Sequence, residues 1–173
     1  PIIGDYQNLA TAYNALKDFK NSIKAYEEII KINPKTPEIY KNLGSAQMKI
    51  LENDSAIDSF KKALEMEPDK FQSIYDYGIV LAENLHYEEA LKYLRTANKI
   101  DPNHLNCMNI IGRCLAATCN YEVAKTMYQK LIILLPDAVG PHIDYASCLM
   151  FEGKYEEPVK ILKDVLIKKP NSL

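Results

Sequence analysis

Apolar residues recur along this chain with the spacing of amphipathic helices, and the pattern of large and small residues repeats every 34 residues. A proline marks the same point in each copy, at Pro34, Pro68, Pro102, Pro136 and Pro170. The prolines divide the chain into five units, residues 3–36, 37–70, 71–104, 105–138 and 139–172. A repeat of this length is typical of a helical solenoid, in which each unit packs only on its neighbours.

Other positions of the 34-residue unit support this division. The eighth position always holds a very small residue, at Ala10, Gly44, Gly78, Gly112 and Ala146. The twenty-fourth position always holds a large one, at Tyr26, Phe60, Leu94, Tyr128 and Leu162. This pattern predicts two helices per unit that approach closely, with small residues of one helix facing large residues of the other. The prolines should end each second helix, because proline cannot continue a helix and restricts the residue before it.

These residues resemble the tetratricopeptide repeat family over essentially the whole chain. The resemblance implies an all-α fold, a right-handed α-α superhelix (solenoid) of tandem helix-turn-helix repeats that forms a single domain over residues 1–173. Two departures concern the turn inside each repeat. The glycine common there survives only as Gly153, and Asn53 replaces the aromatic residue that follows the turn in the other units. We therefore expect the turn of the second repeat to be the least regular.

The charge and the hydropathy of the chain exclude several partners. Its 21 basic and 23 acidic residues are interspersed and give a net charge of −2, so there is no basic stripe for nucleic acid. No apolar stretch is long enough to span a bilayer, so membrane insertion is not expected. The chain begins at Pro1 without an initiator methionine and stops just after the fifth proline, so we expect an excerpt of a longer protein.

No motif for catalysis, a cofactor or a metal ion is present. The cysteines, Cys107, Cys114, Cys119 and Cys148, lack C-x-x-C pairs. Cys114 and Cys148 share a repeat position that is alanine or valine elsewhere, which predicts small core residues. Free thiols favour a reducing, cytoplasmic location. A Gly-rich phosphate loop, a nucleophile elbow and a paired-carboxylate arrangement are all absent from the sequence, so we predict a chain that is not an enzyme.

The resemblance places a peptide-binding groove on the first helices of the repeats. Carried over residue by residue, its candidates are Gln7, Asn8, Thr11, Lys41, Asn42, Ser45, Met48, Tyr75, Asp76, Ile79, Asn106, Asn109 and Arg113. Asparagine is a poor helix former, but its carboxamide matches the N–H and C=O of an extended peptide. The alternative interpretation is that these are solvated helix positions without a ligand. The Lys and Asn pattern with which some family members grip a C-terminal carboxylate is absent.

A second interface is predicted near the C-terminal end, where charged repeat positions have become apolar. Ile133 and Ile167 occupy a position that is lysine or glutamate in the first three units, and Leu135 replaces a polar residue. Such a cluster predicts contact with further repeats, a partner subunit or a second copy.

The sequence thus predicts a non-catalytic interaction scaffold that binds a protein or peptide ligand. The alternative is the substrate-docking or regulatory region of a larger enzyme, such as a transferase or phosphatase. Both hypotheses predict the same groove.

Overall fold

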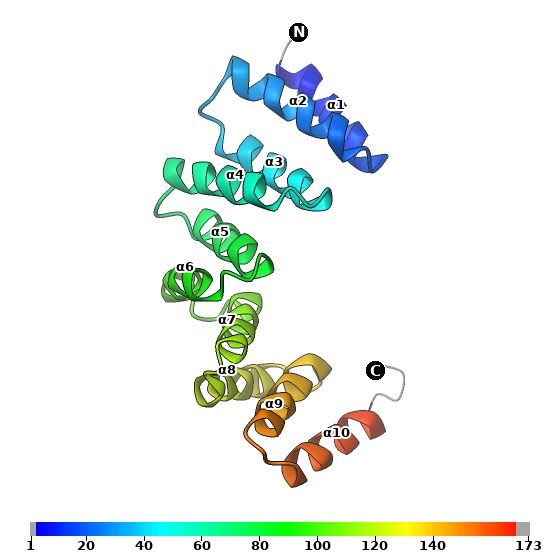
Figure 1. Cartoon of the computed structure of the whole chain (residues 1–173), viewed down its shortest axis with the longest axis vertical. Helices are drawn as coiled ribbons and strands as arrows, with labels where there is room; N and C mark the ends of the chain where they lie inside the picture. The colour runs from blue at the N-terminus through cyan, green and yellow to red at the C-terminus, as the bar shows by residue number, and fades with distance from the viewer. Residues whose placement is uncertain (1–2, 169–173) are drawn as a thin grey trace. The chain divides into compact units, whose positions relative to one another are not determined.

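The computed structural model describes residues 3–168, which form ten α-helices and no strand (Figure 1). The helices are α1 (Ile3–Ala15), α2 (Phe19–Ile32), α3 (Pro37–Lys49), α4 (Asn53–Met66), α5 (Phe71–Glu83), α6 (Tyr87–Ile100), α7 (Leu105–Ala117), α8 (Tyr121–Leu134), α9 (Val139–Phe151) and α10 (Glu156–Lys168). The all-α class and its tandem helix-turn-helix repeats are confirmed. Each second helix with a described proline after it ends two residues before that proline, and Pro170 lies outside the described residues.

The chain falls into two compact units, one ending at Leu85 and the other beginning at His86. The first unit contains α1 to α5 and the second contains α6 to α10. Within each unit, helices that are consecutive in the sequence pack on one another. In the second unit α7 and α9, the first helices of adjacent repeats, are also in contact.

The predicted packing of small residues against large ones is confirmed inside the repeats. A Cβ atom added to Gly44 would lie 2.8 Å from the ring of Phe60, and one added to Gly112 would lie 2.7 Å from the ring of Tyr128. In the first repeat, Ala10 is fully buried and its carbonyl accepts a hydrogen bond from Ser22 Oγ at 3.2 Å. The eighth position is therefore small because the second helix of the repeat lies directly against it.

The turns inside the repeats share one backbone geometry. The fifteenth residue of every unit has a positive φ: Lys17 at 59°, Leu51 at 64°, Leu85 at 65°, Cys119 at 60° and Gly153 at 79°. In the second repeat the N–H of Glu52 then donates to the carbonyl of Gln47 at 3.0 Å, as Asp18 does to Tyr13 at 2.8 Å in the first. The prediction of an irregular second turn is wrong, because these backbone hydrogen bonds hold the turn without glycine or the aromatic residue.

We predict that Leu51→Gly raises the free energy of unfolding by about 0.5–1 kcal/mol, because a side chain in the left-handed region is strained. Leu51 is 81% exposed, so little packing would be lost. Urea unfolding measures the change. Leu51→Ala is the matched control, since it shortens the side chain but keeps the strained Cβ atom, and an equal gain in both variants would contradict the explanation.

A largely buried ion pair joins the fourth repeat to the fifth. Lys125 of α8 occupies a position that is Ile23, Ile57, Leu91 or Val159 in the other units, and it is only 7% exposed. Its Nζ atom lies 2.7 Å from Oε2 of Glu152, the residue that follows α9. Lys154 also reaches this carboxylate, at 3.0 Å. The hydrogen bonds from Lys125 and Lys154 lower the pKa of Glu152 to about 2.

We predict that Glu152→Gln lowers the free energy of unfolding at pH 7 but not near pH 2. A depressed carboxyl pKa stabilises the fold above the ordinary value of 4.5, and this stabilisation disappears as the pH falls to about 2. Urea unfolding of the wild type and the variant across pH 2–7 measures the difference between them. A difference that persists undiminished at pH 2 would show that the lost contact is not electrostatic.

Candidate functional site

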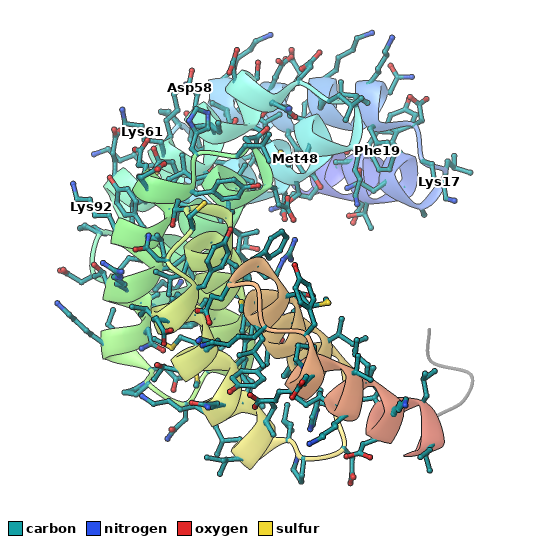
Figure 2. The ribbon with its side chains drawn as sticks, turned by 60° about the horizontal axis from the view of Figure 1, so that its bottom comes forward. Lys17, Phe19, Met48, Asp58, Lys61 and Lys92 are labelled. Atoms are coloured by element: carbon teal, nitrogen blue, oxygen red, sulfur yellow. The ribbon has the colours of Figure 1, made fainter. Side chains whose placement is uncertain are left out.

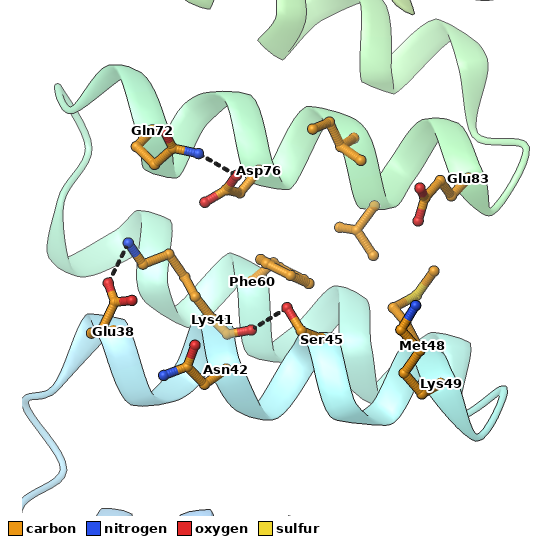
Figure 3. A pocket seen from close by; sticks show the side chains of 12 residues that line it. Glu38, Lys41, Asn42, Ser45, Met48, Lys49, Phe60, Gln72, Asp76 and Glu83 are labelled. Atoms are coloured by element: carbon orange, nitrogen blue, oxygen red, sulfur yellow. Dashed lines mark hydrogen bonds and ion pairs between the residues drawn. The ribbon is translucent and has the colours of Figure 1, made fainter. Parts of the chain in front are cut away.

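A cavity of about 560 Å³ in the first unit is the candidate site. The first helices of the second and third repeats, α3 and α5, form its two walls, and Phe60 of α4 lies between them (Figure 3). Its lining residues are Glu38, Lys41, Asn42, Ser45, Met48, Lys49, Phe60, Gln72, Asp76, Ile79, Val80 and Glu83. Six of the predicted groove residues are thus brought together: Lys41, Asn42, Ser45, Met48, Asp76 and Ile79.

One end of the cavity, formed by Glu38, Lys41, Asn42, Gln72 and Asp76, is its polar end. Nζ of Lys41 lies 2.7 Å from Oε2 of Glu38, one helical turn earlier on α3. Across the cavity, Nε2 of Gln72 donates to Oδ1 of Asp76 at 2.6 Å. Each wall therefore orients its own charged group with a neighbour on the same helix, as Figure 3 shows.

The two charged groups of the polar end respond differently to burial. Lys41 is only 9% exposed, and burial lowers its pKa, but the hydrogen bond and charge of Glu38, with further attraction from Asp76, raise it above the ordinary value. Burial raises the pKa of Asp76, and the hydrogen bond from Gln72 and the charge of Lys41 only partly oppose this. Lys41 is thus stabilised as a cation, whereas the Asp76 anion lacks full compensation.

The Asn42 carboxamide lies half-buried at the same end. Among the described residues it forms no hydrogen bond, and Figure 3 shows it beside Lys41 without a dashed contact. A carboxamide offers one acceptor oxygen and two N–H donors, so it can pair with both groups of a peptide unit.

The other end of the cavity, formed by Met48, Phe60, Ile79 and Val80, is its apolar end. Nδ2 of Asn84, at the C-terminus of α5, lies 3.6 Å from Sδ of Met48 and holds that side chain between the two walls. Val80 is 1% exposed, while Met48, Phe60 and Ile79 are partly exposed. This end can bury an apolar side chain, and methionine adapts readily to its shape.

The remaining predicted groove residues of the first unit do not line this cavity. Tyr75 is 7% exposed and its ring stacks on Phe71 with centroids 5.4 Å apart, so the structure makes it a packing residue instead of a groove residue. Gln7, Asn8 and Thr11 are exposed on α1, where Thr11 Oγ1 donates to the carbonyl of Gln7 at 2.9 Å.

The candidates of the second unit lie on α7. Asn106 and Arg113 are exposed, and Asn109 is half-buried with an Oδ1 atom that has no hydrogen-bond partner in the described part of the chain. Burial raises the pKa of Asp144 on α9, and the charge of Arg113 opposes the shift. The α7 and α9 pair therefore contains a cation whose charge acts on the half-buried aspartate of the neighbouring helix.

The predicted second interface is solvent-accessible. Ile133 is 78% exposed, Leu135 is 38% exposed and Ile167 is 80% exposed. A separate cavity of about 140 Å³ lies between α10 and the first turns of α9 with the segment before them, and Val139, His142 and Val165 are among its lining residues. The three isoleucine and leucine residues are not part of its lining, and their role as an interface stays a prediction.

The cysteine side chains belong mainly to the core. Cys107, Cys114 and Cys148 are buried, as predicted for Cys114 and Cys148, and Cys119 is exposed. Burial raises the pKa of the Cys107 and Cys114 thiols to about 11, which keeps them protonated at neutral pH. Within residues 3–168, no three His, Cys, Asp or Glu side chains are grouped to hold a metal ion. The helices of this region are also too short or too polar to cross a membrane.

The sequence does not indicate the floor of the cavity or part of its walls. The repeat pattern indicates Phe60 only as the large partner of Gly44, because the family's groove positions lie on first helices. Val80 and Glu83 of α5 and Lys49 of α3 fall outside those positions but face the same cavity. The small residue at Gly44 was the available signal, since it brings the Phe60 ring against α3.

We predict that Asp76→Asn raises the midpoint of urea unfolding at pH 7. A raised carboxyl pKa means that ionisation destabilises the fold as the pH rises above the ordinary value of 3.8, and asparagine cannot ionise. Asparagine can still accept the hydrogen bond of Gln72. The higher midpoint of the variant should disappear below about pH 3.8, where the aspartic acid of the wild type and the asparagine of the variant are both neutral. A lower midpoint at pH 7 would show that attraction to Lys41 outweighs the burial of Asp76.

Two protein families match adjoining parts of the chain. Residues 10–50 match a TPR repeat family. Residues 49–131 match the family of anaphase-promoting complex, cyclosome, subunit 3. No curated protein matches the chain in sequence.

Solved structures share the fold over nearly the whole chain. A crystal structure of MamA is 21% identical and has a TM-score of 0.86, with 99% of this chain and 96% of that chain covered. MamA from Desulfovibrio magneticus RS-1 is 18% identical, with a TM-score of 0.91 and coverage of 98% and 96%. YrrB, described as a TPR protein with an unusual peptide-binding site, is 18% identical, with a TM-score of 0.81 and coverage of 96% and 86%. Its repeats, its helical hairpins and these matches show that the chain resembles the tetratricopeptide repeat family and shares its fold.

Proposed function

We propose that this chain is a non-catalytic protein-interaction scaffold that binds an extended peptide segment in the cavity between α3 and α5. The observation that carries the proposal is the composition of this cavity, in which a polar end and an apolar end lie between two parallel helices. Tetratricopeptide repeats are generally interaction modules. The description of YrrB as a peptide-binding TPR protein supports the same use of the fold.

The polar end suits the main chain of a peptide. The Asn42 carboxamide can accept from a peptide N–H and donate to a peptide C=O without selecting a side chain. A ligand that binds this carboxamide breaks no existing hydrogen bond, because the side-chain amide forms none within the described residues.

The apolar end suits one buried side chain of the ligand. Phe60 is fixed by its contact with α3, and Met48 is held by Asn84, so these walls need little reordering when a ligand binds. A preorganised receptor loses less conformational entropy on binding and therefore binds more tightly for the same contacts. If the chain is the docking region of a larger enzyme, the same cavity would bind the substrate segment.

The proposal predicts that selection from a displayed library of random dodecapeptides will enrich sequences that depend on the cavity. For synthetic versions of the enriched peptides, we expect Asn42→Ala combined with Met48→Ala to raise the Kd at least about 10-fold, because a main-chain contact and an apolar contact are both removed. Fluorescence anisotropy with labelled peptides measures the affinity, and far-UV circular dichroism confirms that the variant is folded.

Lys61→Ala is the matched control for this experiment. Lys61 is exposed on α4, and Figure 2 shows it on the side of the unit away from Met48. Its removal should leave the Kd unchanged. The proposal is wrong if no peptide is enriched, or if the enriched peptides bind the double variant and the wild type equally well.

A further inference from the structure

The two half-buried aspartates of the first helices occupy equivalent positions but have different neighbours. Asp76 and Asp144 are each the sixth residue of their repeat. In the second unit Asp144 is influenced by Arg113, the ninth residue of the preceding repeat. In the first unit the ninth residue of the preceding repeat is Ser45. The cavity thus has a serine at the repeat position that supplies a cation in the other unit.

Ser45 does not compensate the charge of Asp76. Its Oγ donates to the carbonyl of Lys41 at 2.9 Å, one turn earlier on its own helix. Lys41, the cation whose charge influences Asp76, is already paired with Glu38 at 2.7 Å. The charges of Glu38, Lys41 and Asp76 sum to −1, from two carboxylates and one ammonium. Within the described residues Asp76 forms no ion pair at 4.0 Å or less, so this end has one anion without a cationic partner.

The spacing of the two ends matches an extended chain. Asp76 and Val80 are four residues apart on α5, which is about 6 Å along the helix axis. Side chains on one face of an extended peptide recur every second residue, about 6.6–6.8 Å apart. A ligand residue at the Asp76 carboxylate therefore places the second residue along its chain at the apolar end.

Building on the proposed function, we infer that the cavity prefers a peptide carrying a lysine or arginine two residues away from a large apolar residue. The cation pairs with Asp76, and the apolar side chain enters between Met48, Phe60 and Ile79. The ligand cation acts on Asp76 as Arg113 acts on Asp144, and it adds the positive charge that the polar end lacks.

The probes for this inference are fluorescein-labelled nonapeptides with blocked termini in a background of Ser, Gly and Ala. One pair carries Lys-x-Leu and the reverse order Leu-x-Lys, so that both directions of the ligand chain along the cavity are tested. The comparison peptides carry Glu in place of Lys, or Ser in place of Leu. Anisotropy titrations at 50 mM salt should give a Kd at least about 10-fold lower for one of the Lys and Leu peptides than for its Glu counterpart.

Three variants of the full chain then assign the preference to residues. Asp76→Asn should reduce the Lys-over-Glu ratio to less than about 2-fold, since it removes the anion. Ser45→Arg should weaken the Lys peptide about 10-fold, because it supplies an internal cation at the position equivalent to Arg113. Ser45→Met, of similar length and without charge, is the steric control and should weaken the peptide by no more than about 2-fold.

The outcomes separate this inference from the proposed function. If peptides bind and depend on Asn42 and Met48 but show no preference for a basic residue, the inference is wrong and the peptide-binding function stands. If Asp76→Asn keeps the full Lys preference, the cation binds elsewhere and the inference is also wrong. If neither these probes nor library peptides bind, both proposals are overturned.

Discussion

The close approach of two helices at the eighth position of each repeat is the constraint on which this structure depends. At Gly44 the absence of a side chain lets the Phe60 ring approach so closely that an added Cβ atom would lie only 2.8 Å from two ring carbons. The same arrangement recurs at Gly112 and Tyr128. Because α4 can approach α3 so closely, its aromatic residue reaches between α3 and α5 and becomes the floor of the cavity. The packing that builds the repeat therefore also shapes the candidate site.

Neighbouring first helices are arranged differently in the two units. In the second unit α7 and α9 contact each other, whereas in the first unit a cavity of about 560 Å³ separates the walls formed by α3 and α5. Buried charges are costly unless they are paired, and most of those described here are paired: Lys125 with Glu152, and Lys41 with Glu38. Asp76 is the notable departure, because burial raises its pKa while its neighbours only partly stabilise the anion. A carboxylate inside a cavity whose charge is not fully compensated is more informative about function than the paired charges around it.

Much of the fold could be predicted from the sequence because its signals are local and repeated. Proline positions predicted where the second helices end, and the small residues predicted where helices touch. The turn of the second repeat was mispredicted because Leu51 adopts the backbone geometry that glycine favours, and a turn held by main-chain hydrogen bonds leaves no reliable mark on the side chains. The strain is small enough for the repeat to tolerate it.

The candidate site was predicted less completely than the fold. The family's groove positions identified Lys41, Asn42 and Asp76, which do meet at the polar end. They failed for Tyr75, since an aromatic residue four positions after Phe71 gains more from stacking and burial than from facing a groove. They could not identify Phe60, because its place in the cavity depends on how closely two helices pack, a property of tertiary structure.

Methionine methyl resonances report whether a ligand peptide occupies the cavity between α3 and α5. Met48 lies at the apolar end of this cavity, whereas Met66, at the end of α4, is 38% exposed outside its lining. In a titration of methyl-labelled protein with a binding peptide, we expect the Met48 resonance to shift in proportion to occupancy while the Met66 resonance stays in place. A peptide that binds and leaves the Met48 resonance unchanged would contradict binding in this cavity.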